Sequence, residues 1–174
     1  MTKKQRKRFY SAIFFAGLIL IIWEIKIFRK TVINLIIPLS IILIVGIIAF
    51  ILDFKNYKKT YDYGKFGLYL YSSMHYIVGF GFIACSVFML TNYYLADKDS
   101  IKETYDIVDK SSMSGSRYHR TEYQPLIRIN YKREIKELVF SHKYYDKMEF
   151  YETVELEVRK GYFGFDILES QKIN

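Results

Sequence analysis

The chain has 174 residues, 51% of them hydrophobic, and a net charge of +8. Residues 1–96 hold 12 basic and 3 acidic side chains, whereas residues 97–174 hold 14 basic and 15 acidic ones and are almost neutral. Since a nucleic-acid-binding protein concentrates Lys and Arg on its folded polar domain, this distribution excludes nucleic acid as an expected partner. A single cysteine excludes an intramolecular disulfide.

Three long apolar segments, at about residues 9–28, 32–52 and 68–95, predict a transmembrane domain that covers residues 1–96. The first segment follows five basic residues within the first eight of the chain, which is the charged start of a signal sequence. No small-x-small cleavage motif follows it, so we expect an uncleaved signal anchor. Glu24 and Lys26, at its outer end, are expected to reach the lipid headgroups.

The second segment has 21 residues without a charge, close to the roughly 20 residues that cross a bilayer as a helix. Pro38 near its start is compatible with a membrane helix, because neighbouring groups can satisfy the carbonyl that a proline leaves free, and a kink is expected there. Buried helices of a soluble protein should show a polar stripe, which this segment lacks. The third segment is bracketed by tyrosines of the kind that collect at lipid–water interfaces: Tyr69, Tyr71, Tyr76, Tyr93 and Tyr94.

Small and polar side chains recur on one face of the third segment. Ser72, Gly79 and Ser86 lie seven residues apart, and His75 follows Ser72 on the same face. Because helices in lipid associate through close packing and polar contacts, we interpret these four residues as a helix-packing face. Packing on the first two helices of the same chain is favoured over contact with a second copy or a partner protein. We interpret His75 as hydrogen-bonded near the membrane surface rather than as a proton relay.

The distribution of basic residues over the loops predicts the orientation in the membrane. The N-terminal stretch and residues 53–66 hold nine Lys and Arg, against five between the first two spans and just after the third. We therefore expect a multi-pass protein of the bacterial cytoplasmic (inner) membrane with its N-terminus in the cytoplasm and its C-terminal domain outside. A re-entrant hairpin formed by the first two segments would reverse the side of that domain.

Residues 97–174 predict a small soluble all-β domain. Apolar and polar side chains alternate at residues 105–107, 127–132, 154–159 and 163–167, which is the pattern of half-buried strands. We expect about five strands in an antiparallel sheet or partial barrel. Some 70 residues make a marginal core, so the domain is expected to rely on the membrane, a second copy or a partner.

Glycines and polar residues mark the turns of this domain. Gly161, after Lys160, suggests a hairpin turn, and Gly164 inside the last predicted strand suggests a bulge or a close approach of another backbone. Residues 111–121 are expected to form a polar loop, and residues 141–151 either a loop or one or two helical turns.

No segment carries a motif that dictates a reaction. The three histidines are far apart and there is no Cys cluster, so no metal site is predicted, and no phosphate-binding loop or nucleophile elbow is present. Arg117, His119 and Arg120 form a candidate anion-binding loop, for which a solvated basic loop is the favoured interpretation. We expect a protein that is not an enzyme and needs no cofactor.

The expected function is that of an integral membrane protein that presents an extracytoplasmic β domain for protein–protein contact, as an accessory subunit or immunity-type protein of an envelope complex. Its expected partners are the lipid bilayer and either a second copy of the chain or another membrane protein. The alternative is a ligand-sensing effector whose β domain binds a small molecule and whose helices oligomerise to permeabilise the membrane. The order of helices and then a small β domain is similar to that of bacterial antiphage effectors that sense cyclic nucleotides, which implies a cytoplasmic sensor domain.

Overall fold

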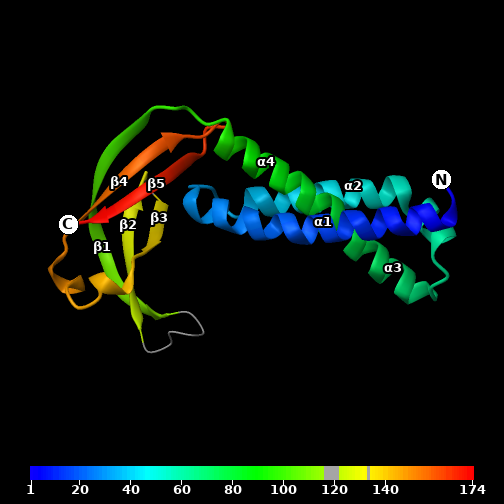
Figure 1. The fold of residues 1–174 in the computed structure, drawn as a ribbon, viewed down its shortest axis with the longest axis horizontal. Coiled ribbons are helices and arrows are strands. Elements are labelled where there is room, and N and C mark those ends of the chain that lie inside the picture. Colours follow the sequence, from blue (N-terminus) through cyan, green and yellow to red (C-terminus); the bar gives the residue numbers. More distant parts are fainter. Residues whose placement is uncertain (116–121, 133) are drawn as a thin grey trace. The chain divides into compact units, whose positions relative to one another are not determined.

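The predicted fold class is confirmed: three long apolar helices precede a five-stranded antiparallel sheet (Figure 1). The computed structural model describes residues 1–115, 122–132 and 134–174. Two compact units are present, one made of residues 1–96 with residues 161–165, and the other of residues 97–160 with residues 166–174. All three helices are long and apolar enough to cross a membrane.

Helix α1 (Lys3–Lys30) is longer than the predicted first span because the basic residues before that span are also helical. A capping box fixes its start: the Gln5 amide donates to the Thr2 hydroxyl at 3.3 Å and the Thr2 amide donates to the Gln5 side-chain oxygen at 2.8 Å. The helix ends at Thr31, whose backbone is extended.

Helix α2 (Ile36–Thr60) begins four residues later than the predicted second span. The side-chain oxygen of Asn34 accepts a hydrogen bond from the Ile36 amide at 2.9 Å and so satisfies one of the free amides at the start of the helix. Pro38 is the third residue of α2, where an amide has no carbonyl partner within the helix. It removes no hydrogen bond, and the reason for expecting a kink disappears.

The third apolar helix has three parts: α3 (Lys65–Met74), the π-helical segment η1 (His75–Gly81) and α4 (Phe82–Tyr94). The backbone stays in the helical region through both junctions. A π-helical segment changes the phase of the helix, and such segments are frequent at functional sites. Here η1 packs against both α1 and α2.

Glycines allow the helix backbones to approach closely. A Cβ atom added at Gly17 of α1 would collide with the carbonyl oxygen of Val78, and one added at Gly81 would lie 2.5 Å from the carbonyl oxygen of Ile42 in α2. Neither carbonyl can move without displacing its helix. Gly17 and Gly81 therefore set the distances of η1 from α1 and from α2.

The sheet has the strand order β3-β2-β1-β4-β5, with every neighbouring pair antiparallel. Its strands are β1 (Ser100–Ser114), β2 (Tyr123–Tyr131), β3 (Glu134–Val139), β4 (Thr153–Lys160) and β5 (Asp166–Ile173). The long strand β1 pairs with β4 through residues 100–106 and with β2 through residues 107–114. Short 3-10 turns, η2 (His142–Tyr144) and η3 (Met148–Phe150), lie in the segment predicted as loop or helical turns. One face forms the core, which includes Ile127, Ile129, Leu138, Val154, Leu156, Ile167 and Leu168.

Three local predictions in this domain are wrong. Residues 111–114, predicted as loop, belong to β1 because they pair with β2. Residues 163–165, predicted as strand, belong to the turn before β5, and Gly164 has the positive φ of 86° that such a turn requires rather than marking a bulge. The aromatic alternation at residues 163–165 has another cause, because within the helical unit Phe163 stacks on Phe88 at 4.8 Å between ring centroids.

The turn of residues 161–165 is held by one side chain of α4. Asn92 is fully buried; its side-chain oxygen accepts from the Phe163 amide at 3.0 Å and its amide nitrogen donates to the Phe165 carbonyl at 3.1 Å. A Cβ atom at Gly161 would collide with the Asn92 side chain, so this glycine is required by the contact.

Replacing Gly17 with alanine should destabilise the helix bundle by about 1–3 kcal/mol, because the added methyl group meets a backbone carbonyl. The matched control is Gly67→Ala in α3, where the added atom makes only an ordinary contact of 3.7 Å with Tyr71. Both changes gain the same helix propensity, so the difference between them isolates the collision. The measurement is the unfolding free energy in detergent micelles, and equal values for the two variants would contradict the interpretation.

Candidate functional site

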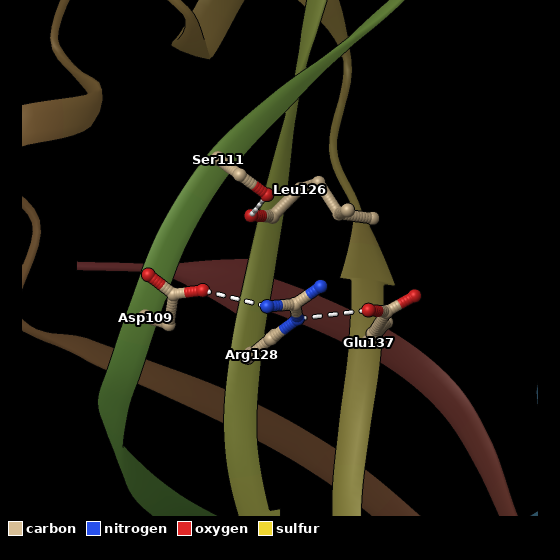
Figure 2. Close-up of polar contacts among 5 residues, drawn as sticks. All are labelled: Asp109, Ser111, Leu126, Arg128 and Glu137. Carbon is tan, nitrogen blue, oxygen red and sulfur yellow. Dashed lines mark hydrogen bonds and ion pairs between the residues drawn. The ribbon is translucent and has the colours of Figure 1, made fainter.

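An ion-pair network lies across β1, β2 and β3 (Figure 2). Arg128 of β2 donates from Nη1 to Asp109 of β1 and from Nε to Glu137 of β3, both at 2.8 Å. The three residues are direct cross-strand partners, so the sheet register sets the network. The hydrogen bond and the charge of Glu137, followed by those of Asp109, raise the pKa of Arg128. The side chains are 40–50% exposed, so the network adds little stability but holds the guanidinium in one orientation.

Exposed apolar side chains flank this network. Ile135 and Val139 lie two residues on either side of Glu137 in β3, so all three point to the same face of the strand. Ile135 is 70% exposed and Val139 is 48% exposed. We call Asp109, Arg128, Ile135, Glu137 and Val139 the β3 surface.

The β3 surface lies along an edge of the sheet. Among the described residues β3 pairs only with β2, so its other side presents backbone amides and carbonyls without a strand partner. Such edges are templates for pairing with another strand. Arginine is also among the residues that are enriched at protein interfaces.

A second feature of the β unit is a cavity of about 370 Å³ that is lined by side chains of both signs of charge. Four carboxylates and three lysines surround it: Asp97, Asp99, Glu103, Asp166, Lys98, Lys132 and Lys160. Lys132 is paired with Asp166 at 2.6 Å. Carboxylates outnumber ammonium groups, so the lining does not favour an anionic ligand.

Two tyrosines donate to carboxylates of this cavity. The Tyr131 hydroxyl donates to Asp166 at 2.9 Å and the Tyr105 hydroxyl to Glu103 at 2.5 Å, with the two rings 5.2 Å apart. Burial, followed by these hydrogen bonds to charged oxygens, raises the pKa of both tyrosines. Both hydroxyls therefore keep their protons more firmly in the folded protein than in the unfolded chain.

The stability of the sheet should consequently fall as the pH rises above about 10, the ordinary pKa of tyrosine. A raised pKa stabilises the fold fully below that pH and progressively less above it. Near-UV circular dichroism of thermal unfolding between pH 8 and pH 11 measures the effect. Tyr131→Phe should flatten the pH dependence of the stability. Tyr123→Phe, at an exposed tyrosine, should leave that dependence as in the unchanged protein. The same slope in both variants would refute the assignment.

The helical unit contains a buried carboxyl group. Glu24 of α1 is 6% exposed, and its two oxygens accept from Cys85 Sγ at 2.8 Å and from Ser86 Oγ at 2.9 Å on α4. The expectation that Glu24 reaches the headgroups was therefore wrong. Ser86 lies eight residues, about 12 Å along the helix, before Tyr94 at the end of α4, so this contact is about two helical turns away from the tyrosines at that end.

Loss of the serine hydroxyl from this contact should cost stability. We expect Ser86→Ala to lower the unfolding free energy in detergent by about 1 kcal/mol, in the range measured for hydrogen bonds between membrane helices. Ser73→Ala is the control, because Ser73 is half-buried on the same helix and has no side-chain hydrogen bond to any described residue. A cost for Ser73→Ala as large as that for Ser86→Ala would count against a specific bond to Glu24.

A second polar cluster lies toward the other end of the helices. Asp53 of α2 accepts from the hydroxyls of Tyr10 and Tyr76 at 2.5 and 3.0 Å, and from the Asn56 amide at 2.7 Å. Tyr10 belongs to α1, Tyr76 to η1 and Asn56 to α2 itself, so Asp53 connects α2 with both α1 and η1. Both oxygens of its carboxylate accept hydrogen bonds, which indicates a structural role.

The four predicted helix-packing residues have different surroundings. Gly79 lies against α1, where an added Cβ would be 2.7 Å from Ile13, and Ser86 bonds to Glu24 as described. Ser72 is buried, and its hydroxyl donates to the Leu68 carbonyl of its own helix at 2.6 Å. His75 is half-buried; its Nδ1 lies 2.8 Å from the Tyr71 carbonyl and 3.1 Å from the Tyr57 hydroxyl.

The candidate anion-binding loop, Arg117, His119 and Arg120, lies outside the described residues. Among the residues that are described, no group of three or more His, Cys, Asp or Glu side chains has the arrangement of a metal site. No protein family model matches this chain, and neither the curated proteins nor the solved structures contain a match to it.

The buried contact of Glu24 is one that the sequence prediction missed. The signal was present, because Tyr10, Gly17 and Glu24 lie seven residues apart and are all buried. The same spacing identified Ser72, Gly79 and Ser86 on the third helix. On α1 the position of this charged residue at the apparent end of a span instead suggests a headgroup contact.

Proposed function

We propose that this protein is a non-enzymatic integral membrane protein whose helices anchor a small β domain that binds another protein. The β3 surface is the observation that carries the proposal. It combines an open strand edge, two exposed branched side chains and an arginine held between two carboxylates. A partner can add backbone hydrogen bonds along β3 and bury Ile135 and Val139.

The proposed location of this domain is outside the cytoplasm, as part of an envelope complex or as an immunity-type protein. Its support is the excess of nine over five basic residues on the proposed cytoplasmic side. Glu24 and Asp53 both accept hydrogen bonds from other helices of the bundle, which favours helices that serve as a rigid anchor rather than as a transport path.

The second candidate is a ligand-sensing effector, which the cavity at Lys98, Lys132 and Lys160 supports. It ranks second because the carboxylates at the same cavity oppose an anionic ligand such as a cyclic nucleotide. It also requires the β domain to be cytoplasmic. Reporters fused after Asn174 separate the two functions: activity of an extracytoplasmic reporter alone rules out the nucleotide sensor, and activity of a cytoplasmic reporter alone rules out the envelope contact.

A photo-crosslinking amino acid at Ile135 should capture a discrete partner in native membranes, because this side chain is 70% exposed on the proposed contact surface. The control is the same crosslinker at Lys147, an exposed residue of the turn between η2 and η3. Mass spectrometry of the crosslinked band identifies either a second copy or another protein. Absence of any band specific to position 135 would argue against the proposed surface.

The matched substitution is Ile135→Asp against Ile101→Asp, since Ile101 is an isoleucine of β1 with a similar exposure of 66%. A charge at position 135 should abolish the crosslink from a neighbouring position such as Val139, because it would be buried against the partner without a counter-charge. A charge at position 101 should leave the yield within about twofold of the unchanged protein by the usual tolerance of exposed sites. Equal losses for both variants would contradict a contact centred on β3.

A further inference from the structure

A groove lined by two lysines and three aromatic rings lies between the ends of α1 and α4. It has a volume of about 350 Å³, and its lining is Trp23, Lys26, Ile27, Lys30, Tyr93 and Tyr94. The four residues from α1 are spaced by three and four positions, so they form one face of the last two turns of that helix. All six belong to the helical unit.

The groove has the polarity of the lipid–water interface. Trp23 is 57% exposed and Tyr94 is 62% exposed, and such residues concentrate where a helix leaves the hydrocarbon. One turn below Trp23 on the same face, Ile19 is 64% exposed. From Ile19 to Lys30 the face therefore changes from aliphatic to aromatic to cationic over about 16 Å.

The two ammonium groups have no anionic partner within the described structure. No carboxylate of the described residues forms an ion pair with Lys26 or Lys30. Like charges one helical turn apart repel each other by a few tenths of a kcal/mol. Glu24, the nearest acidic residue in the sequence, faces away and is occupied by Cys85 and Ser86.

We propose that this groove binds an anionic glycerophospholipid of the leaflet at that end of the helices. The phosphate lies between Lys26 and Lys30, and an acyl chain runs along Trp23 and Ile19. A lipid fits better than free phosphate because the apolar part of the same face continues from the charged end into the hydrocarbon. Basic pockets between membrane helices bind lipid headgroups by this combination of charge and chain contact. The inference depends on the membrane placement of the helices and not on the function of the β domain.

The chain supplies its own probe, since Trp23 is its single tryptophan and lines the groove. The full-length protein is reconstituted in phosphatidylcholine vesicles that contain brominated phosphatidylglycerol or, at the same mole fraction, brominated phosphatidylcholine. Quenching of tryptophan fluorescence by the two lipids gives their relative occupancy of the site. We expect a preference for phosphatidylglycerol of up to about thirtyfold, from about 1 kcal/mol for each of the two lysines.

A double variant Lys26→Gln and Lys30→Gln should lose this preference, whereas Lys26→Arg and Lys30→Arg, which keeps both charges, should retain it. Lys58→Gln and Lys59→Gln, at the last turn of α2, is the matched control for general attraction of anionic lipid to a basic protein and should retain the preference. Addition of millimolar glycerol phosphate should not change the quenching, because a free phosphate lacks the chain contact.

Three outcomes would overturn the proposal. Equal quenching by the two brominated lipids would show that the groove has no preference for an anionic headgroup. An equal loss of preference in the Lys58 and Lys59 control would assign the effect to net charge. Displacement of brominated phosphatidylglycerol by glycerol phosphate would assign the site to a soluble anion.

Discussion

The structure depends on the register in which α1 packs against the third helix. Two layers, each offset by the same sequence separation of 62 residues, pair Gly17 with Gly79 and Glu24 with Ser86. The glycines bring the backbones together, and that approach lets Glu24 reach a hydroxyl of α4. In lipid no hydrophobic drive between helices assists this contact. The polar contacts therefore require the close approach of the backbones at the glycines.

The same register determines which partners the ionisable groups of the helices have. Glu24 and Asp53 are expensive in a membrane unless every oxygen has a donor, and both have donors from other helices. The π-helical segment η1 places Tyr76 on Asp53 and Gly81 against α2 at once. Lys26, two residues after Glu24, remains exposed on another face, where it forms the groove with Lys30. One helix thus separates its buried acid from its exposed bases by the helical period alone.

The β domain contains two polar networks that differ in exposure and in effect. The sheet register places Arg128 between two carboxylates. Tyr105 and Tyr131 instead donate part-buried hydrogen bonds to carboxylates. The first network is on an exposed surface, where it orders a side chain at little gain in stability. The second is part-buried, and we expect it to make folding sensitive to high pH. An ordered, exposed network beside apolar residues suits a binding surface. A domain this small buries little apolar surface in its own core.

By itself the sequence determined the existence of the helices and of the sheet, because length, hydropathy and alternation are local properties that a reader can see in one segment. It also determined the small-residue face of the third helix, since seven-residue spacing needs no partner to be recognised. Only the tertiary structure decided what that face meets, because the partner of Glu24 lies more than 60 residues away and depends on helix register. The β3 surface was decided in the same way: Asp109, Arg128 and Glu137 look like ordinary solubilising charges until strand pairing brings them together. Phe163 and Phe165 were misread for that reason, since their alternation comes from packing on α4 and not from a strand.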